Sequence, residues 1–115
     1  MKEHTLKLQE IYYNYILNGS KRIEIRLNDE KRRLINKGDI IHFFKEPELK
    51  ESFDAKVIDL IYFENFTQMF DVFPIDILAD KSVGKENLLN DLEKFYTPEK
   101  QEKYGVCCIK IELLK

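Results

Sequence analysis

Residues 19–26 read Gly-Ser-Lys-Arg-Ile-Glu-Ile-Arg, and this stretch is the most informative in the chain. Two isoleucines alternate with Glu24 and Arg26, which is the period of a strand with one buried face. The alternation places Glu24 and Arg26 on the same face, beside Lys21 from the preceding turn. A carboxylate next to two cations at the start of a strand indicates either a salt-bridge network or a polar ligand site.

The patterns on both sides of this stretch predict further strands and helices. Alternating or continuous apolar runs predict strands at residues 4–8, 22–27, 40–44, 55–63 and 106–114. Helical stripes cover residues 11–16, 66–73 and 88–96, and a further helix begins at Thr97-Pro98. Short strands with inserted helices predict an α+β fold, a small mixed β-barrel with helices closing its ends. The length predicts one domain, residues 1–115.

Aromatic residues are assigned to the core or the surface by their helical spacing. Tyr12 and Tyr15 lie on the apolar stripe of the first helix and are predicted to be core residues. Tyr13 falls off this stripe and is predicted to be exposed. Asn65 is predicted to cap the helix of residues 66–73.

The charge is nearly balanced over the chain but not along it. There are 19 basic and 21 acidic residues, a net charge of −2, which argues against binding of polyanions through overall charge. Residues 21–37 nevertheless hold seven basic and three acidic side chains, in a segment predicted to be mostly loop. A local basic patch is therefore expected there.

Several classes of protein are disfavoured by the sequence. Residues 1–7 are charged and lead into no apolar segment, and no run approaches a membrane span, so we expect a cytoplasmic protein without a membrane partner. Cys107 and Cys108 are neighbours in a predicted strand, so their side chains point to opposite faces and cannot easily pair with each other. We therefore expect reduced thiols. His4 and His42 have no ligand-like spacing, so no metal or other cofactor is predicted.

The motif G-x-K-x-x-E-x-R at residues 19–26, followed by Lys37-Gly38-Asp39-Ile40-Ile41, resembles the signature of the ASCH domain family. Similar stretches elsewhere are residues 11–17, 74–76 and 104–106, so the resemblance covers nearly the whole chain. The resemblance implies a β-barrel similar to the PUA RNA-binding domain.

The same resemblance implies binding of RNA or a nucleotide-like small molecule in a cleft beside the barrel. The cleft is expected to be lined by the lysine and the Glu-x-Arg pair of the motif. The candidate ligand-binding residues are Lys21, Glu24, Arg26, Tyr104, Arg32 and Arg33, the last two as a rim that contacts phosphate. Nothing in the sequence indicates the oligomeric state.

An enzyme is the alternative. Some small ASCH proteins are amidohydrolases that remove the acetyl group from acetylcytidine, using a lysine that matches Lys21, a threonine and a downstream glutamate. In this chain Glu24 stands at the threonine position, so the hydroxyl nucleophile is missing, which favours a binding module. If the chain is an enzyme, the candidate catalytic residues are Lys21, Glu24 and Glu86. A third hypothesis is a protein-interaction module with an inert cleft.

Each candidate also has a purely structural interpretation. Lys21 would be a solvated lysine at a helix C-terminus, and Glu86 a favourable charge at a helix N-terminus. Glu24 and Arg26 would form an exposed salt bridge worth about 0–1 kcal/mol. Residues 31–33 would be a solvated basic loop.

Overall fold

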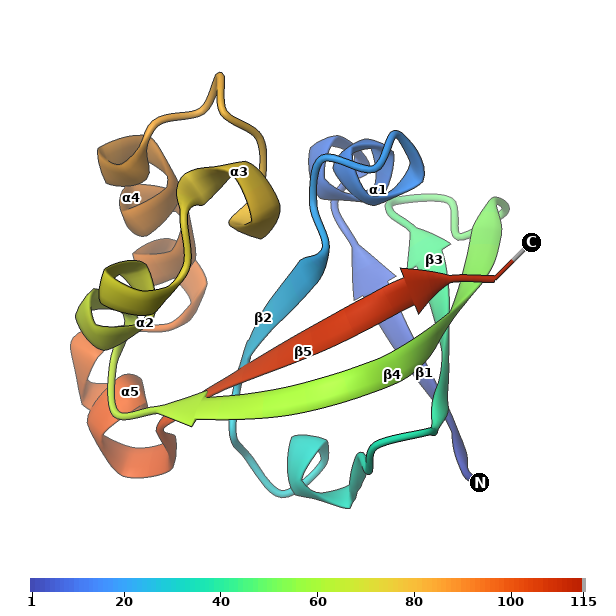
Figure 1. Ribbon diagram of the computed structural model, residues 1–115, viewed down its shortest axis with the longest axis horizontal. Coiled ribbons are helices and arrows are strands. Elements are labelled where there is room, and N and C mark those ends of the chain that lie inside the picture. The colour runs from blue at the N-terminus through green and yellow to red at the C-terminus, as the bar shows by residue number, and fades with distance from the viewer. Residues whose placement is uncertain (115) are drawn as a thin grey trace.

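The computed structural model describes residues 1–114, which form one curled sheet with helices packed against it (Figure 1). The strands are β1 (Glu3–Leu8), β2 (Ile23–Leu27), β3 (Ile40–Lys45), β4 (Ser52–Phe63) and β5 (Val106–Leu113). The helices are α1 (Glu10–Leu17), α2 (Phe66–Val72), α3 (Ile75–Leu78), α4 (Lys85–Phe95) and α5 (Pro98–Tyr104), with a 3₁₀ turn η1 (Arg32–Leu34). All the predicted strands are present, which confirms the α+β class.

The strands are ordered β1-β3-β4-β5-β2 in the sheet. β1 pairs with β3 in parallel, and the other neighbours are antiparallel. The long strand β4 has a register shift between Val57 and Asp59, and such bulges bend a strand and increase its twist. The sheet therefore curls into a half-barrel whose edges are β1 and β2 (Figure 1).

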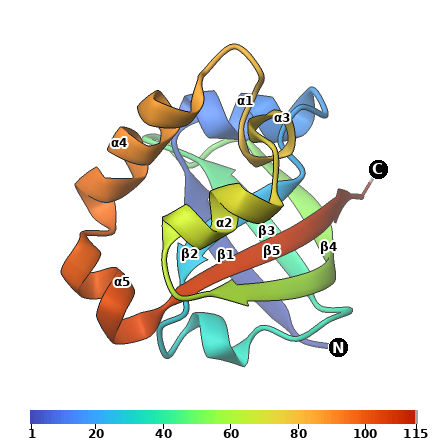
Figure 2. The ribbon, with the colours of Figure 1, turned by 60° about the vertical axis from the view of Figure 1, so that its left-hand side comes forward.

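Hydrophobic side chains form one core on each face of the sheet. The first core lies between the sheet and α1, and the second between the sheet and α2, α3 and α4 (Figure 2). Cys107 belongs to the first core and Cys108 to the second, which confirms that these neighbours point to opposite faces. Both are free thiols. β5 is thus covered on both faces, which explains its nearly continuous apolar run.

Helix boundaries follow local capping chemistry where the sequence supplies it. The Asn65 side chain accepts a hydrogen bond from the Gln68 amide at 3.0 Å, which confirms the predicted cap of α2. The Thr97 hydroxyl caps α5 in the same way, 3.3 Å from the Lys100 amide. The sequence analysis missed α3 and η1, because four and three residues are too short to show a helical period.

The orientation of α1 differs from the prediction. Tyr13 was predicted to be exposed, which is wrong: it is 3% exposed, and its ring centre lies 4.9 Å from that of Phe53. Ile11, assigned to the apolar stripe, is 50% exposed. α1 contacts β3, so this tertiary contact determines which face of the helix is buried. In this orientation of α1 Tyr12 is half-buried, and its side chain lines a cavity.

Candidate functional site

The turn between α1 and β2 directs Lys21 into the protein. Gly19 ends α1 with φ +89°, a conformation that a side chain would strain, and its amide donates to the Ile16 carbonyl at 3.1 Å. The Lys21 amide then donates to the Tyr15 carbonyl at 3.0 Å. The Lys21 side chain is only 3% exposed, so its interpretation as a solvated lysine is wrong.

The buried ammonium of Lys21 has three neighbours. Nζ donates to the Leu78 carbonyl at 2.7 Å and lies 3.5 Å from Oε1 of Glu24. It also lies 5.7 Å from the ring centre of Tyr12. Leu78 is the last residue of α3, and carbonyls at a helix C-terminus have no partner within the helix. Burial lowers the pKa of Lys21, and the attraction of Glu24 only partly offsets this.

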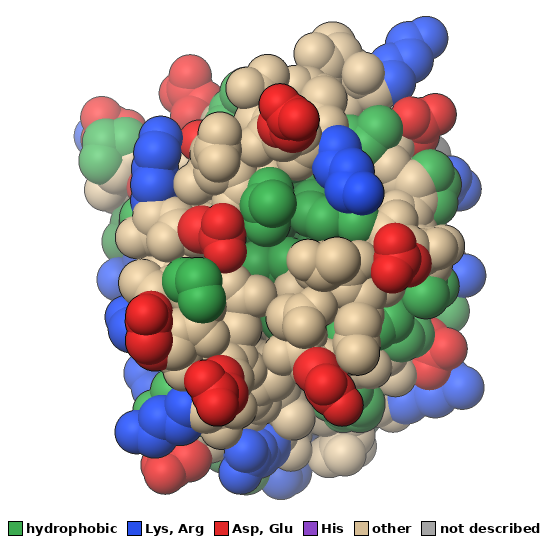
Figure 3. Space-filling model, turned by 90° about the vertical axis from the view of Figure 1, so that its left-hand side faces the viewer, with side chains coloured by type: hydrophobic (Ala, Val, Ile, Leu, Met, Phe, Trp, Pro, Cys, Tyr) green, Lys and Arg blue, Asp and Glu red, His purple; other side chains and the backbone are tan. Residues whose placement is uncertain are grey.

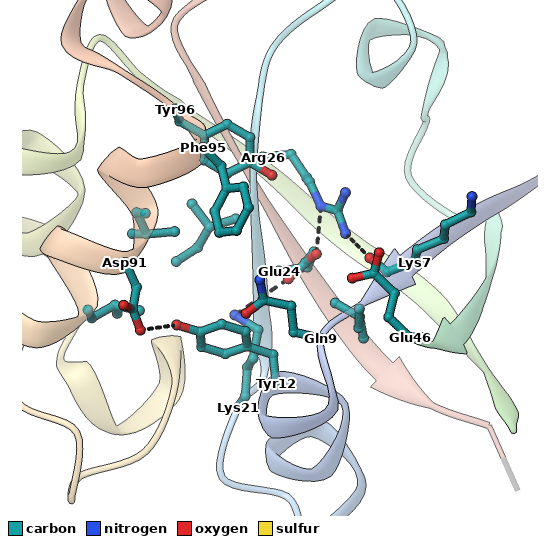
Figure 4. A pocket seen from close by; sticks show the side chains of 14 residues that line it. Lys7, Gln9, Tyr12, Lys21, Glu24, Arg26, Glu46, Asp91, Phe95 and Tyr96 are labelled. Atoms are coloured by element: carbon teal, nitrogen blue, oxygen red, sulfur yellow. Dashed lines mark hydrogen bonds and ion pairs between the residues drawn. The ribbon is translucent and has the colours of Figure 1, made fainter. Parts of the chain in front are cut away.

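Glu24 lies between two cations (Figure 4). Nε of Arg26 donates to Oε2 of Glu24 at 2.7 Å, and Nη2 of Arg26 donates to the Lys7 carbonyl at 2.7 Å. Burial alone would raise the pKa of Glu24, but attraction to Arg26 and Lys21 outweighs it and keeps the pKa below its usual value. The three side chains therefore form a buried, ionised group, here called the ion triad (Lys21, Glu24 and Arg26).

A cavity of about 330 Å³ opens beside the ion triad, between α1, β1, β2 and α4. Its lining residues are Lys7, Leu8, Gln9, Tyr12, Lys21, Glu24, Ile25, Arg26, Glu46, Leu88, Asp91, Leu92, Phe95 and Tyr96. The Tyr12 hydroxyl donates to Oδ2 of Asp91 at 3.1 Å and so links α1 to α4 across the cavity (Figure 4). Burial, reinforced by Asp91, raises the pKa of Tyr12 above its usual value.

The cavity combines balanced charge with aromatic walls. Three cations line it, Lys7, Lys21 and Arg26, and so do three carboxylates, Glu24, Glu46 and Asp91. Tyr12, Phe95 and Tyr96 supply rings. The helical face of the protein carries acidic side chains across its front and most of its basic ones near the edges (Figure 3). This arrangement suits an uncharged planar group with polar edges better than an anion.

The other candidate residues lie outside this cavity. Glu86 is in the first turn of α4, is exposed and is not among the lining residues. Tyr104 lines a second cavity, beside α5. Arg33 is exposed, and its Nε donates to a main-chain carbonyl of its own loop at 3.0 Å. Arg32 lines a separate groove, to which Arg26 also contributes.

The sequence analysis did not select the cavity residues that come from α4 and its C-cap, Tyr96. Asp91, Phe95 and Tyr96 were treated as parts of a helix or as core. One signal was available, because Asp91 lies three residues after Leu88 and four before Phe95, on the apolar face of α4. The Asp91 side chain is about half exposed, and its carboxylate has two partners, the Tyr12 hydroxyl at 3.1 Å and the Lys94 ammonium at 3.2 Å.

The part of the chain that the structure describes has neither a metal-binding cluster nor a membrane-spanning helix. Within residues 1–114, no group of three or more His, Cys, Asp or Glu side chains is arranged to hold a metal ion. None of the helices in the same range has the length and apolarity of a membrane span.

Comparison with known proteins gives both a family and close structural relatives. The sequence model of the ASCH domain matches residues 6–115. The crystal structure of the hypothetical protein PH0355 is 36% identical over 99% of this chain and 100% of that one, with a TM-score of 0.84. The solution structure of protein PF0455 from Pyrococcus furiosus is 33% identical over 100% and 99% of the two chains, with a TM-score of 0.75.

A more distant structure shares the fold alone. ASCH from Zymomonas mobilis is 10% identical, with a TM-score of 0.67, over 96% of this chain and 66% of that one. No curated protein sequence matches this chain.

Proposed function

Because this chain belongs to the ASCH domain family, whose fold resembles that of RNA-binding domains, we propose that its cavity binds a base of RNA or of a nucleotide-like ligand. The observation that carries the proposal is the pairing of aromatic walls with the buried ion triad in one cavity, whose three cations and three carboxylates balance. Sequence-specific recognition of RNA commonly uses this combination, with the base stacked on aromatic rings and its polar edge hydrogen-bonded.

The size and chemistry of the cavity support a single base as the bound group. Ligand cavities begin at about 300 Å³, and this one is near that limit. Phe95 is 53% exposed at the cavity, so a base can reach its ring. In this proposal Glu24 accepts a hydrogen bond from an exocyclic amine, and Arg26 donates to a ring carbonyl. The hydrogen bond from Lys21 to Leu78 holds the lysine in place behind them.

The test uses an exposed aromatic residue, because changes in the ion triad would also affect folding. Phe95→Ala removes a cavity ring, whereas Tyr62→Ala removes a ring that is equally exposed, at 53%, but lies outside this cavity. Stacking of one base is worth about 1–3 kcal/mol, so Phe95→Ala should weaken binding of short single-stranded RNA by at least about 5-fold. Tyr62→Ala should leave the affinity within about 2-fold of the wild-type value.

Binding is measured by fluorescence anisotropy at several salt concentrations. Lys21→Ala and Arg26→Ala should also weaken RNA binding, provided that circular dichroism shows each variant to be folded. Equal affinities for the wild type, Phe95→Ala and folded Arg26→Ala would contradict the proposal. A larger loss in Tyr62→Ala than in Phe95→Ala would assign the RNA to the cavity beside α5 instead.

A second candidate function is hydrolysis of an amide such as acetylcytidine. It is favoured by Lys21, whose pKa is lowered by burial and which lies 3.5 Å from a carboxylate, an arrangement used for general acid–base catalysis. For this reaction the Lys21 ammonium would first lose its proton to solvent, and the neutral amine would then take a proton from water as the water attacks the amide carbonyl. The proton would pass to the leaving amine as the C–N bond breaks, giving cytidine and acetate.

The enzyme hypothesis has a direct assay. Purified protein is incubated with acetylcytidine and cytidine is measured by chromatography. Glu86→Gln should keep any activity, since Glu86 is outside the cavity, and Glu24→Gln should lose it. No cytidine at high protein concentration would exclude this function, and loss of activity in Glu86→Gln alone would overturn the assignment of Glu24.

A further inference from the structure

The separate groove that Arg32 lines is strongly basic and lies next to the cavity beside the ion triad. It has a volume of about 450 Å³ and is lined by residues of β1, β2 and the segment around η1. Its charged lining residues, apart from one histidine, are Lys7, Arg26, Lys31 and Arg32, and among the described residues no carboxylate lines it. We call it the basic groove (Lys7, Arg26, Lys31 and Arg32). Its charge contrasts with that of the cavity, where three carboxylates balance three cations.

Two lysines and one arginine nitrogen of the basic groove have no partner among the described residues. Among the ion pairs formed within residues 1–114, none includes Lys7 or Lys31. Nε of Arg32 is buried and has no hydrogen-bond partner in the same range, while Nη1 of Arg32 lies 3.6 Å from Oδ2 of Asp29. A buried donor without a partner is costly, so this N–H indicates a missing acceptor.

The basic groove and the cavity share two residues, Lys7 and Arg26. Arg26 uses Nε for Glu24 and Nη2 for the Lys7 carbonyl, and neither of these bonds occupies Nη1. Figure 4 shows the Arg26 guanidinium between Glu24 and Lys7. A ligand held in the cavity by a flat ring would therefore have an anionic substituent beside Arg26, at the entrance to the basic groove. The planar fork of arginine suits a phosphate in particular.

We propose that the basic groove binds a phosphate group attached to the ligand whose base occupies the cavity. The ligand is then a nucleotide or an RNA chain, not a nucleoside. Arg32 donates its unpartnered Nε–H to a phosphate oxygen, and Lys31 contributes a second positive charge. This inference rests on the proposed function, because it places the base in the cavity beside the ion triad.

The test compares ligands that differ only in phosphate. Calorimetry is carried out with cytidine, its 3′- and 5′-monophosphates, and the dinucleoside monophosphate of cytidine, and is repeated with the other bases. One charge-assisted hydrogen bond to phosphate should strengthen binding by about 10-fold or more relative to the nucleoside. A further gain for the dinucleoside monophosphate would identify RNA as the source of the phosphate, and equal affinity would identify a free nucleotide.

Single substitutions show which residues bind the phosphate group. Arg32→Ala and Lys31→Ala should lower the ratio of nucleotide to nucleoside affinity by about 10-fold. Lys37→Ala is the matched control, since it removes the same charge from an exposed site of the same loop outside the basic groove. The dependence of nucleotide binding on salt should be weaker in Arg32→Ala and unchanged in Lys37→Ala.

Failure of the phosphate site and failure of the proposed base-binding function give different results in these experiments. Equal binding of nucleosides and nucleotides would overturn the phosphate site and leave the base-binding function intact. Equal losses in Arg32→Ala and Lys37→Ala would show a general electrostatic effect, and would also overturn it. If neither nucleosides nor nucleotides bind, the proposed function itself fails.

Discussion

Replacing Glu24 by glutamine tests the ion triad most sharply, because the substitution keeps the shape of the side chain and removes its charge. The Glu24 side chain is 5% exposed, and its oxygens lie 2.7 Å from Arg26 Nε and 3.5 Å from Lys21 Nζ. These cations are themselves 13% and 3% exposed. Water therefore screens the pairs little, and the values typical of exposed salt bridges do not apply.

The expected loss follows from the two charges left behind. Removing one partner of a buried ion pair costs about 3–5 kcal/mol, compared with about 5–15 kcal/mol for the whole free energy of unfolding of a domain. With a urea dependence of about 2 kcal/mol per molar, Glu24→Gln should lower the midpoint of urea unfolding by about 1.5–2.5 M. In a Lys21→Met background the same change should cost less, because one of the two unpaired charges is absent.

The effect should also depend on pH with a defined sign. Although burial opposes it, attraction to Arg26 and Lys21 lowers the pKa of Glu24 in the folded protein, so the carboxylate stabilises the fold above its unfolded pKa of about 4.5. That contribution is lost as the pH falls below 4.5 towards the folded pKa. The difference in stability between the wild type and Glu24→Gln should therefore be full at neutral pH and shrink in acid.

Glu112→Gln is the matched control, because Glu112 is an exposed glutamate on β5. It should change the free energy of unfolding by no more than about 0.5 kcal/mol. If Glu24→Gln cost as little as Glu112→Gln, or if its effect did not depend on pH, the account of a buried, ionised carboxylate would be refuted.

Three further predictions concern other parts of the fold. Hydrogen bonds outweigh burial and lower the pKa of Asp39 to about 2, so Asp39→Asn should lower the free energy of unfolding by about 1–3 kcal/mol at pH 6 in urea titrations. This difference from the wild type should vanish as the pH falls from 3.8 to 2, and a difference that persists at pH 2 would contradict the hydrogen-bonded carboxylate. Tyr12→Phe removes the hydrogen bond to Asp91 and should lower the free energy of unfolding by about 0.5–1.5 kcal/mol in urea titrations; no change would contradict the link between α1 and α4. Burial raises the pKa of Cys107 to about 11 and that of Cys108 to about 12, so a thiol reagent at pH 8 should modify them only after unfolding, and rapid modification of the folded protein would contradict their burial.

The sequence was sufficient to predict those features that depend on residues close together along the chain. The alternation after Gly19 predicted β2 and the shared face of Glu24 and Arg26, and these two side chains do form a hydrogen bond. The caps at Asn65 and Thr97 were also predictable, because each depends on residues within three positions.

Long-range contacts explain what the sequence did not reveal. The acceptor for Lys21 is a main-chain carbonyl 57 residues away, and a carbonyl has no side-chain pattern to recognise. Tyr12 and Asp91 are 79 residues apart, so no periodicity relates them. The burial of Tyr13 instead of Ile11 depends on how α1 packs against β3, which helical spacing alone does not determine.

The central claim is that a base binds in the cavity beside the ion triad, and amide chemical-shift mapping tests it most directly. ¹⁵N-labelled protein is titrated with nucleotides of each base, up to millimolar concentration. We predict that the largest shifts cluster at Tyr12, Glu24, Arg26 and Phe95, which line the cavity. Shifts that cluster around Tyr104, or no shifts with any nucleotide, would contradict the claim.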